Sequence, residues 1–137
     1  MPMVYRIDSE ARVVVAAGYG AITEEDVFGY QKEVWSRSDV AGFHELIDMT
    51  RVTDIVAPSA GRVRDLAALS AEMDATLAGT RAAIVAPDDL AFGMGRMYQN
   101  YRELNPLTVR EVGVFRTMEE ALVFLRMDRA LALPDAP

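Results

Sequence analysis

The sequence contains no cysteine, one histidine and one tryptophan among its 137 residues. Without cysteine the chain forms no disulfide bond and has no thiol chemistry, which suits a reducing compartment. A single histidine also excludes metal sites that are built on two or more histidines. These absences remove the thiol, disulfide and histidine-rich metal classes of function.

Long apolar runs and clusters of positive charge are also missing. No window approaches the roughly 20 apolar residues that a membrane-spanning helix needs. The first residues lack the basic flank and the apolar core of a signal peptide. The formal charge is −7, from 21 acidic and 14 basic residues, and the bases form no polybasic face that would attract nucleic acid or anionic lipid. We therefore expect a cytoplasmic protein that binds neither nucleic acid nor a membrane.

A short apolar run between Arg81 and Pro87 organises the rest of the chain. Its residues do not alternate between apolar and polar, which indicates a strand buried on both faces and hence a sheet covered by helices on both sides. The length fits one domain. We predict a single domain over residues 1–127 and a flexible C-terminal tail over residues 128–137, where two prolines occur.

The remaining apolar patterns predict the element order β-β-α-β-α-β-α-β-α, an α/β layered sheet that is mostly parallel with an antiparallel N-terminal strand. Helix starts are marked by capping residues, and Thr23 and Thr117 each have an acid three residues later, as a capping box requires. The expected strands are residues 3–8, 11–18, 44–49, 81–86 and 109–115, and the expected helices are residues 23–37, 58–78, 90–104 and 118–127.

The third predicted helix carries two glycines one turn inside its start, Gly93 and Gly95. Each glycine costs a helix about 1 kcal/mol relative to alanine, so a close helix contact or room for a ligand or partner should offset the cost. Residues 91, 94, 98 and 101 form a stripe that is typical of core packing. The residues that we expect to contact a ligand or partner are Phe92, Gly93, Gly95, Arg96 and Met97.

Catalytic constellations are hard to build from these residues. His44 begins its predicted strand, on the opposite edge of the sheet from the loops that would carry a nucleophile, so a Ser-His-Asp triad has no plausible geometry. We expect His44 to be a surface residue at a strand end. The pair Gly93 and Gly95 lacks the third glycine and the lysine of a phosphate-binding loop.

Four acids follow predicted strands and offer one enzymatic alternative. Asp48, Asp54, Asp88 and Asp89 belong to the edge where parallel α/β sheets bind ligands, and their oxygens suit magnesium. The favoured interpretation is local, because short acids at such positions cap helices or lie on wet loops. We therefore expect no metal, no cofactor and no enzymatic activity.

Several motifs, in order along residues 3–125, resemble STAS domains, the anti-sigma-factor antagonist fold, and in particular the SpoIIAA-like, STAS/SEC14-like branch. They are residues 46–54 (LIDMTRVTD) with 59–61 (SAG), 83–88 (AIVAPD), 92–98 (FGMGRMY), and 114–116 (VFR) with 120–122 (EAL). The resemblance implies a small cytoplasmic module that binds proteins or small ligands. It also implies a phosphorylation switch at a serine that corresponds to Ala60 here, so Ser59, one residue earlier, is the candidate regulatory residue.

Two binding functions follow from these observations. The first is a non-enzymatic STAS-like regulatory or binding module that acts through protein contacts, and we expect it to be a homodimer. The second is a small apolar-ligand (lipid-like) binding protein, with a pocket between the sheet and the third helix.

Overall fold

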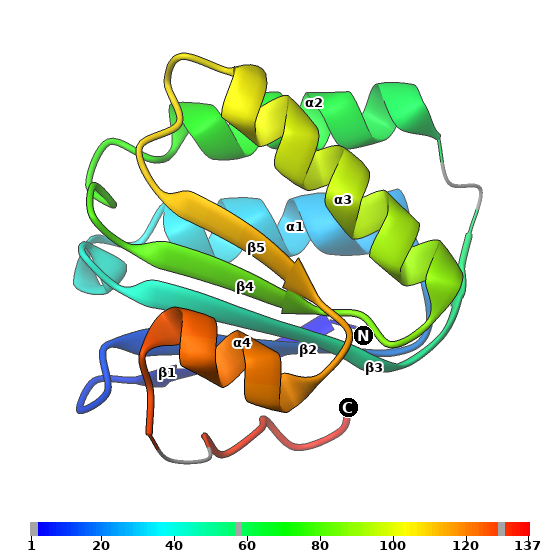
Figure 1. Cartoon of the computed structure of the whole chain (residues 1–137), viewed down its shortest axis with the longest axis horizontal. Helices are drawn as coiled ribbons and strands as arrows, with labels where there is room; N and C mark the ends of the chain where they lie inside the picture. Colours follow the sequence, from blue (N-terminus) through cyan, green and yellow to red (C-terminus); the bar gives the residue numbers. More distant parts are fainter. Residues whose placement is uncertain (1–2, 57–58, 129–130) are drawn as a thin grey trace.

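Five strands form one sheet in the order β1-β2-β3-β4-β5 in the computed structural model, which describes residues 3–56, 59–128 and 131–137 (Figure 1). The strands are β1 Met3–Asp8, β2 Val13–Ile22, β3 His44–Ile55, β4 Arg81–Val85 and β5 Glu111–Phe115. β1 pairs antiparallel with β2, and the other neighbours are parallel. The predicted fold class and element order are confirmed.

Helices cover both faces of this sheet. The helices are α1 Glu24–Trp35, α2 Ala60–Glu72, α3 Asp89–Leu104 and α4 Met118–Leu125, with a short 3-10 turn, η1 Ser38–Val40, that the sequence analysis did not predict. Figure 1 shows α4 on one face and α1, α2 and α3 on the other. Within the described residues, no helix combines the length and apolar character that crossing a membrane requires.

Side-chain alternation along the central strands divides the core into two halves. On β2, Val14 and Ala16 pack on the side of α1, whereas Val13 and Val15 pack on the side of α4. β4 was predicted to be buried on both faces, and Ala82, Ala83 and Val85 are. Ile84 is only half-buried, because the side of the sheet under α2 and α3 is incompletely filled.

Strands β2 and β3 are longer than the sequence predicted. They were expected to end near residues 18 and 49, yet they stay paired to Ile22 and Ile55 with irregular register beyond Ala17. Gly20 adopts φ +67 in this extension, a conformation that favours glycine. The extension carries Ile22 and Ile55 past the other strands to the start of α1 and α2.

The predicted N-caps are present at all four helices. Thr23 and Asp26 form a reciprocal capping box, whereas at Thr117 the acid three residues later bonds the hydroxyl of its cap. Ser59 accepts a hydrogen bond from Arg62 N at 3.1 Å, and Asp88 caps α3 in the same way. Pro58, which was predicted to open α2, lies outside the described residues.

The C-terminal tail contacts the body of the domain. Leu131 and Leu133 pack against the core on the α4 side, and Pro134 is buried. Arg6 Nε donates a 2.8 Å hydrogen bond to the carbonyl of Ala132. The sequence predicts flexibility here, and the structure shows contacts over residues 131–134.

Candidate functional site

An apolar cavity of about 150 Å³ lies between the sheet and the helices α1, α2 and α3. Four strands, β1 to β4, and three helices contribute to it. Its floor is Ile47, Met49 and Ile84; Ile22 and Ile55 close one side; the helices add Val27, Phe28, Val63, Leu66, Met94 and Gly95. A cavity of this size between sheet and third helix is the pocket that the ligand hypothesis requires.

The position of α2 explains why this space is open. α2 packs mainly against α3 and makes little contact with the sheet. Its buried residues, Ala67, Ser70 and Ala71, lie in its second half. Val63 and Leu66, in the first half, are partly exposed and line the cavity.

The inner end of the cavity is a buried polar network centred on Glu45. Tyr30 and Trp35 donate hydrogen bonds of 2.6 and 2.9 Å to the same oxygen, Glu45 Oε2. Arg110 Nη1 lies 3.5 Å from Glu45 Oε1, and the guanidinium stacks on the Trp35 ring. Burial raises the pKa of Tyr30 well above its ordinary value, and the nearby Glu45 carboxylate raises it further. Tyr30 is therefore a neutral hydrogen-bond donor at every physiological pH.

The outer end of the cavity is more exposed and carries charge. Arg62, in the first turn of α2, donates from Nε to Glu24 Oε2 at 2.9 Å and thereby joins the starts of α1 and α2. Its guanidinium stacks over the ring of Phe28 at 4.2 Å. Ser59, Glu24, Phe28 and Arg62 all line this end, so the candidate regulatory serine lies at the cavity as well as at the N-cap of α2.

The five predicted contact residues of α3 divide between two surfaces. Gly95 faces the sheet and lines the cavity, and a Cβ there would lie 2.9 Å from Val114 Cγ1. A Cβ at Gly93 would meet no described atom within 4 Å other than its chain neighbours and the backbone of its own helix. Phe92 lies under the guanidinium of Arg116, whereas Arg96 and Met97 are exposed and half-buried, respectively.

The outward face of α3 presents an apolar stripe that the sequence analysis did not single out. Leu90 is 45% exposed and Leu104 is 80% exposed. Gly93 and Met97 lie between them at helical spacing, so the four residues form one line along the helix. We call this set (Leu90, Gly93, Met97, Leu104) the outer α3 stripe.

The strand-end acids do not converge. Asp48 is buried and accepts hydrogen bonds from Thr50, Asp88 caps α3, and Asp89 pairs with Arg116 at 2.6 Å. Asp54 is exposed on β3. Over residues 3–56, 59–128 and 131–137, no three acids or histidines lie close enough together to hold a metal ion.

His44 differs from the surface residue that the sequence predicted. It is half-buried, and its Nδ1 accepts a 3.0 Å hydrogen bond from the backbone N–H of Arg81. Burial lowers its pKa, and the positive charges of Arg110 and Arg81 lower it further. The histidine is thus a neutral link between β3 and β4, because Nδ1 must be unprotonated to accept this bond.

Sequence patterns could not distinguish the cavity from core. The ends of β2 and β3, together with Phe28, Val63 and Leu66, are apolar residues at periodic spacing, which is also the signal for ordinary packing. Arg62 belongs to none of the motifs that the sequence shows. Its role at the cavity depends on Glu24, 38 residues earlier in the chain.

Comparison with known proteins identifies solved structures with a similar fold. No protein-family model matches the chain, and no curated protein matches its sequence. It is similar to the structure of an uncharacterized DUF3478-family protein with a SpoIIAA-like fold from Shewanella loihica PV-4, at 21% identity and TM-score 0.52 over 90% of this chain and 93% of that one. It is also similar to the unphosphorylated anti-sigma factor antagonist SpoIIAA, at 14% identity and TM-score 0.49 over 90% of this chain and 97% of that one. The chain therefore has the SpoIIAA-like fold that its sequence motifs resemble.

Proposed function

We propose that this protein is a non-enzymatic binding module and that its ligand is a small apolar molecule held between the sheet and α3. The cavity of about 150 Å³ carries this proposal. An engineered protein cavity of about this volume, lined by leucine, isoleucine and phenylalanine, stays dry and binds benzene. A ligand of about that size would gain dispersion contacts that the lining side chains otherwise lack.

The polar groups around the cavity support binding over catalysis. Tyr30 and Glu45 are already bonded to each other and to Trp35, and Glu24 is paired with Arg62. A nucleophile activated by a neighbouring base needs a hydrogen bond between the two groups. Tyr30 and Glu45 form such a pair, but burial and the Glu45 carboxylate raise the pKa of Tyr30 well above its ordinary value, so its hydroxyl stays protonated and is a poor nucleophile.

A cavity-filling variant tests this proposal. Val63→Phe adds four carbon atoms from α2 to the cavity, so we expect wild type to bind benzene and cyclohexane and the variant to lose both. Val123 lies on α4 and is 77% exposed. Val123→Phe is therefore the matched control and should bind both ligands like wild type. Binding is measured by chemical-shift titration and by the rise in melting temperature with ligand concentration. Absence of binding to the wild type, or equal binding to Val63→Phe, contradicts the proposal.

The outer α3 stripe favours a second candidate, a homodimer that acts through protein contacts. Met97 lies seven residues from both Leu90 and Leu104. An antiparallel pairing of two α3 helices about Met97 would therefore set Leu90 of each chain against Leu104 of the other, as a two-fold interface requires. Gly93 leaves open space beside this line, which would let the helices approach closely.

Solution mass tests the dimer. Sedimentation equilibrium of the wild type should show a concentration-dependent dimer, which Met97→Lys should abolish. Val123→Lys places the same charge on an exposed apolar position of α4 and should leave the dimer intact. A wild-type protein that stays monomeric at high concentration, or a dimer that survives Met97→Lys, contradicts this candidate.

A further inference from the structure

We propose that the ligand carries an acidic head group that binds Arg62, so that the cavity accepts a small amphipathic carboxylate with an apolar body of about six carbon atoms. The inference rests on the proposed apolar-ligand function and specifies which end of the ligand is polar. It is carried by the different burial of the two ends of the cavity and by the unused donors of Arg62.

The cavity has one buried end and one exposed end. Tyr30 and Glu45 are 6% and 5% exposed, whereas the Arg62 side chain is 42% exposed. A polar head placed among buried groups would lose its hydration, whereas at the exposed end it keeps contact with water. The apolar body therefore points toward Tyr30, and the head lies beside Arg62.

The buried end would also reject an anion. Its donors, the Tyr30 hydroxyl and the Trp35 indole, already bind the Glu45 carboxylate. Arg110 pairs with the other Glu45 oxygen and is not among the residues that line the cavity. A second carboxylate there would therefore lie beside Glu45 with no cation in the lining next to it, and like charges in a poorly solvated site repel strongly. The sign of the charge thus selects the outer end for the head group.

Arg62 has the geometry and the donors to bind a carboxylate. Stacking on Phe28 at 4.2 Å restrains the plane of the guanidinium next to the apolar lining. Of its side-chain nitrogens, only Nε makes a hydrogen bond among the described residues, to Glu24, while Nη1 lies 3.7 Å from Asp65. The outer nitrogens of the fork therefore remain available, and arginine binds carboxylates with such paired donors.

Glu24 and Asp65 set the strength of this interaction. Both are acidic and lie within 4 Å of the Arg62 guanidinium, so they compete with a ligand carboxylate. Removing the charge of Glu24 should therefore tighten binding of an anion without changing the apolar part of the cavity. This opposite response of two neighbouring residues separates head-group recognition from a general effect on packing.

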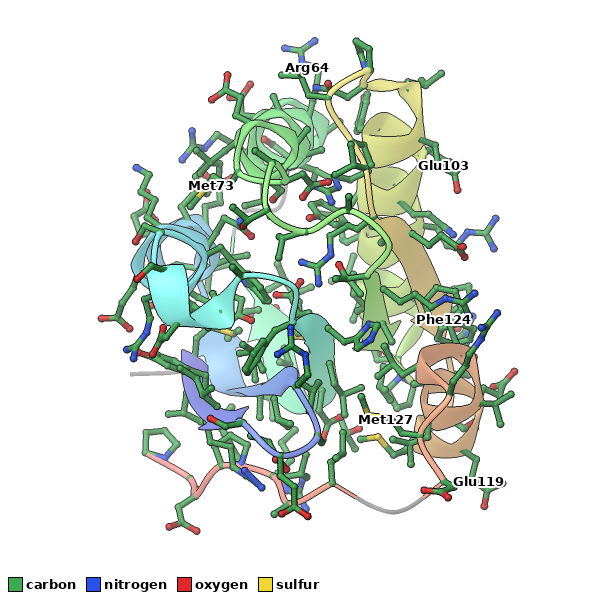
Figure 2. The ribbon with its side chains drawn as sticks, turned by 90° about the vertical axis from the view of Figure 1, so that its left-hand side faces the viewer. Arg64, Met73, Glu103, Glu119, Phe124 and Met127 are labelled. Atoms are coloured by element: carbon green, nitrogen blue, oxygen red, sulfur yellow. The ribbon has the colours of Figure 1, made fainter. Side chains whose placement is uncertain are left out.

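Hexanoate and 1-hexanol test the head group, because they share one chain length and differ in charge. In low salt, we expect the wild type to bind hexanoate roughly three- to tenfold more tightly than 1-hexanol, which is the range of an exposed charge-assisted contact. Arg62→Gln should abolish this preference, so that hexanoate no longer binds more tightly than 1-hexanol, and Arg62→Lys should keep part of the preference. Glu24→Gln should strengthen hexanoate binding alone. Arg64→Gln, an exposed residue that points away from α2 (Figure 2), is the charge-matched control and should behave as wild type.

The outcomes distinguish a failure of the head-group inference from a failure of the proposed apolar-ligand function. If both compounds bind equally to wild type, or if Arg62→Gln keeps the preference, the head-group inference is overturned and the apolar-ligand function stands. If neither compound binds and benzene does not bind, the proposed function fails and the inference fails with it. Retained 1-hexanol binding in Arg62→Gln shows that this variant is folded.

Discussion

Alanine substitutions at the two glycines of α3 should have opposite effects on stability. In an open helix position, glycine to alanine stabilises a protein by about 1 kcal/mol. Gly93 is such a position, because the added Cβ meets nothing within 4 Å beyond its chain neighbours and its own helix backbone in the described part of the chain. We therefore expect Gly93→Ala to raise the free energy of unfolding by about 0.5–1 kcal/mol.

At Gly95 the same methyl group meets the sheet. The Cβ would lie 2.9 Å from Val114 Cγ1 and 3.5 Å from Val114 Cγ2, closer than carbon atoms normally approach. Valine is stiff about χ1 and cannot turn aside without strain, and overpacking costs about 1–3 kcal/mol. Set against the helix gain of about 1 kcal/mol, Gly95→Ala should be neutral to about 2 kcal/mol destabilising.

Urea unfolding checks the pair, with fluorescence of Trp35 as the probe, since it is the single tryptophan and is buried. We expect the two variants to differ by about 1–3 kcal/mol in the free energy of unfolding, with similar slopes against urea. If Gly95→Ala is as stabilising as Gly93→Ala, Gly95 does not lie against Val114, and the position of α3 at the cavity is contradicted.

Two further predictions concern buried charge. Asp74→Ala should destabilise the protein by about 3–5 kcal/mol, because it leaves Arg102 as an unpaired buried charge; the Arg102 side chain is 2% exposed and pairs with Asp74 at 2.8 Å. Adding Arg102→Met should recover much of the lost free energy of unfolding, measured in urea. No recovery would contradict the role of the unpaired charge. For His44, the lowered folded-state pKa means that the unfolded state binds more protons. Its contribution to stability is complete above the ordinary histidine pKa of about 6.5 and is lost as pH falls toward the lower folded pKa. His44→Asn keeps an acceptor for the Arg81 N–H, so between pH 7 and 5 its stability should fall less than that of wild type; an equal fall would contradict the assignment.

The fold could be predicted because its signals are local. Capping residues such as Thr23 and Asp88 mark helix starts through hydrogen bonds within three residues. The unbroken apolar run of β4 predicts burial on both faces, which Ala82, Ala83 and Val85 confirm, whereas Ile84 is half-buried because its burial depends on how the helices opposite pack. The same locality explains the errors: the extension of β2 and β3 to Ile22 and Ile55 depends on pairing between strands, and the bond of His44 depends on Arg81, 37 residues away.

By itself the sequence determined the order of strands and helices, the α/β layering and the small number of potential catalytic groups. Periodicity and capping depend on residues close together in the chain, and composition does not depend on the fold. Only the tertiary structure decided that α2 rests on α3 more than on the sheet, that Val63 and Leu66 line a cavity, and that Arg62 lies at its exposed end. An apolar stripe looks the same whether the surface opposite lies in contact or several ångströms away. That distance is set by how the helices pack on one another (Figure 2).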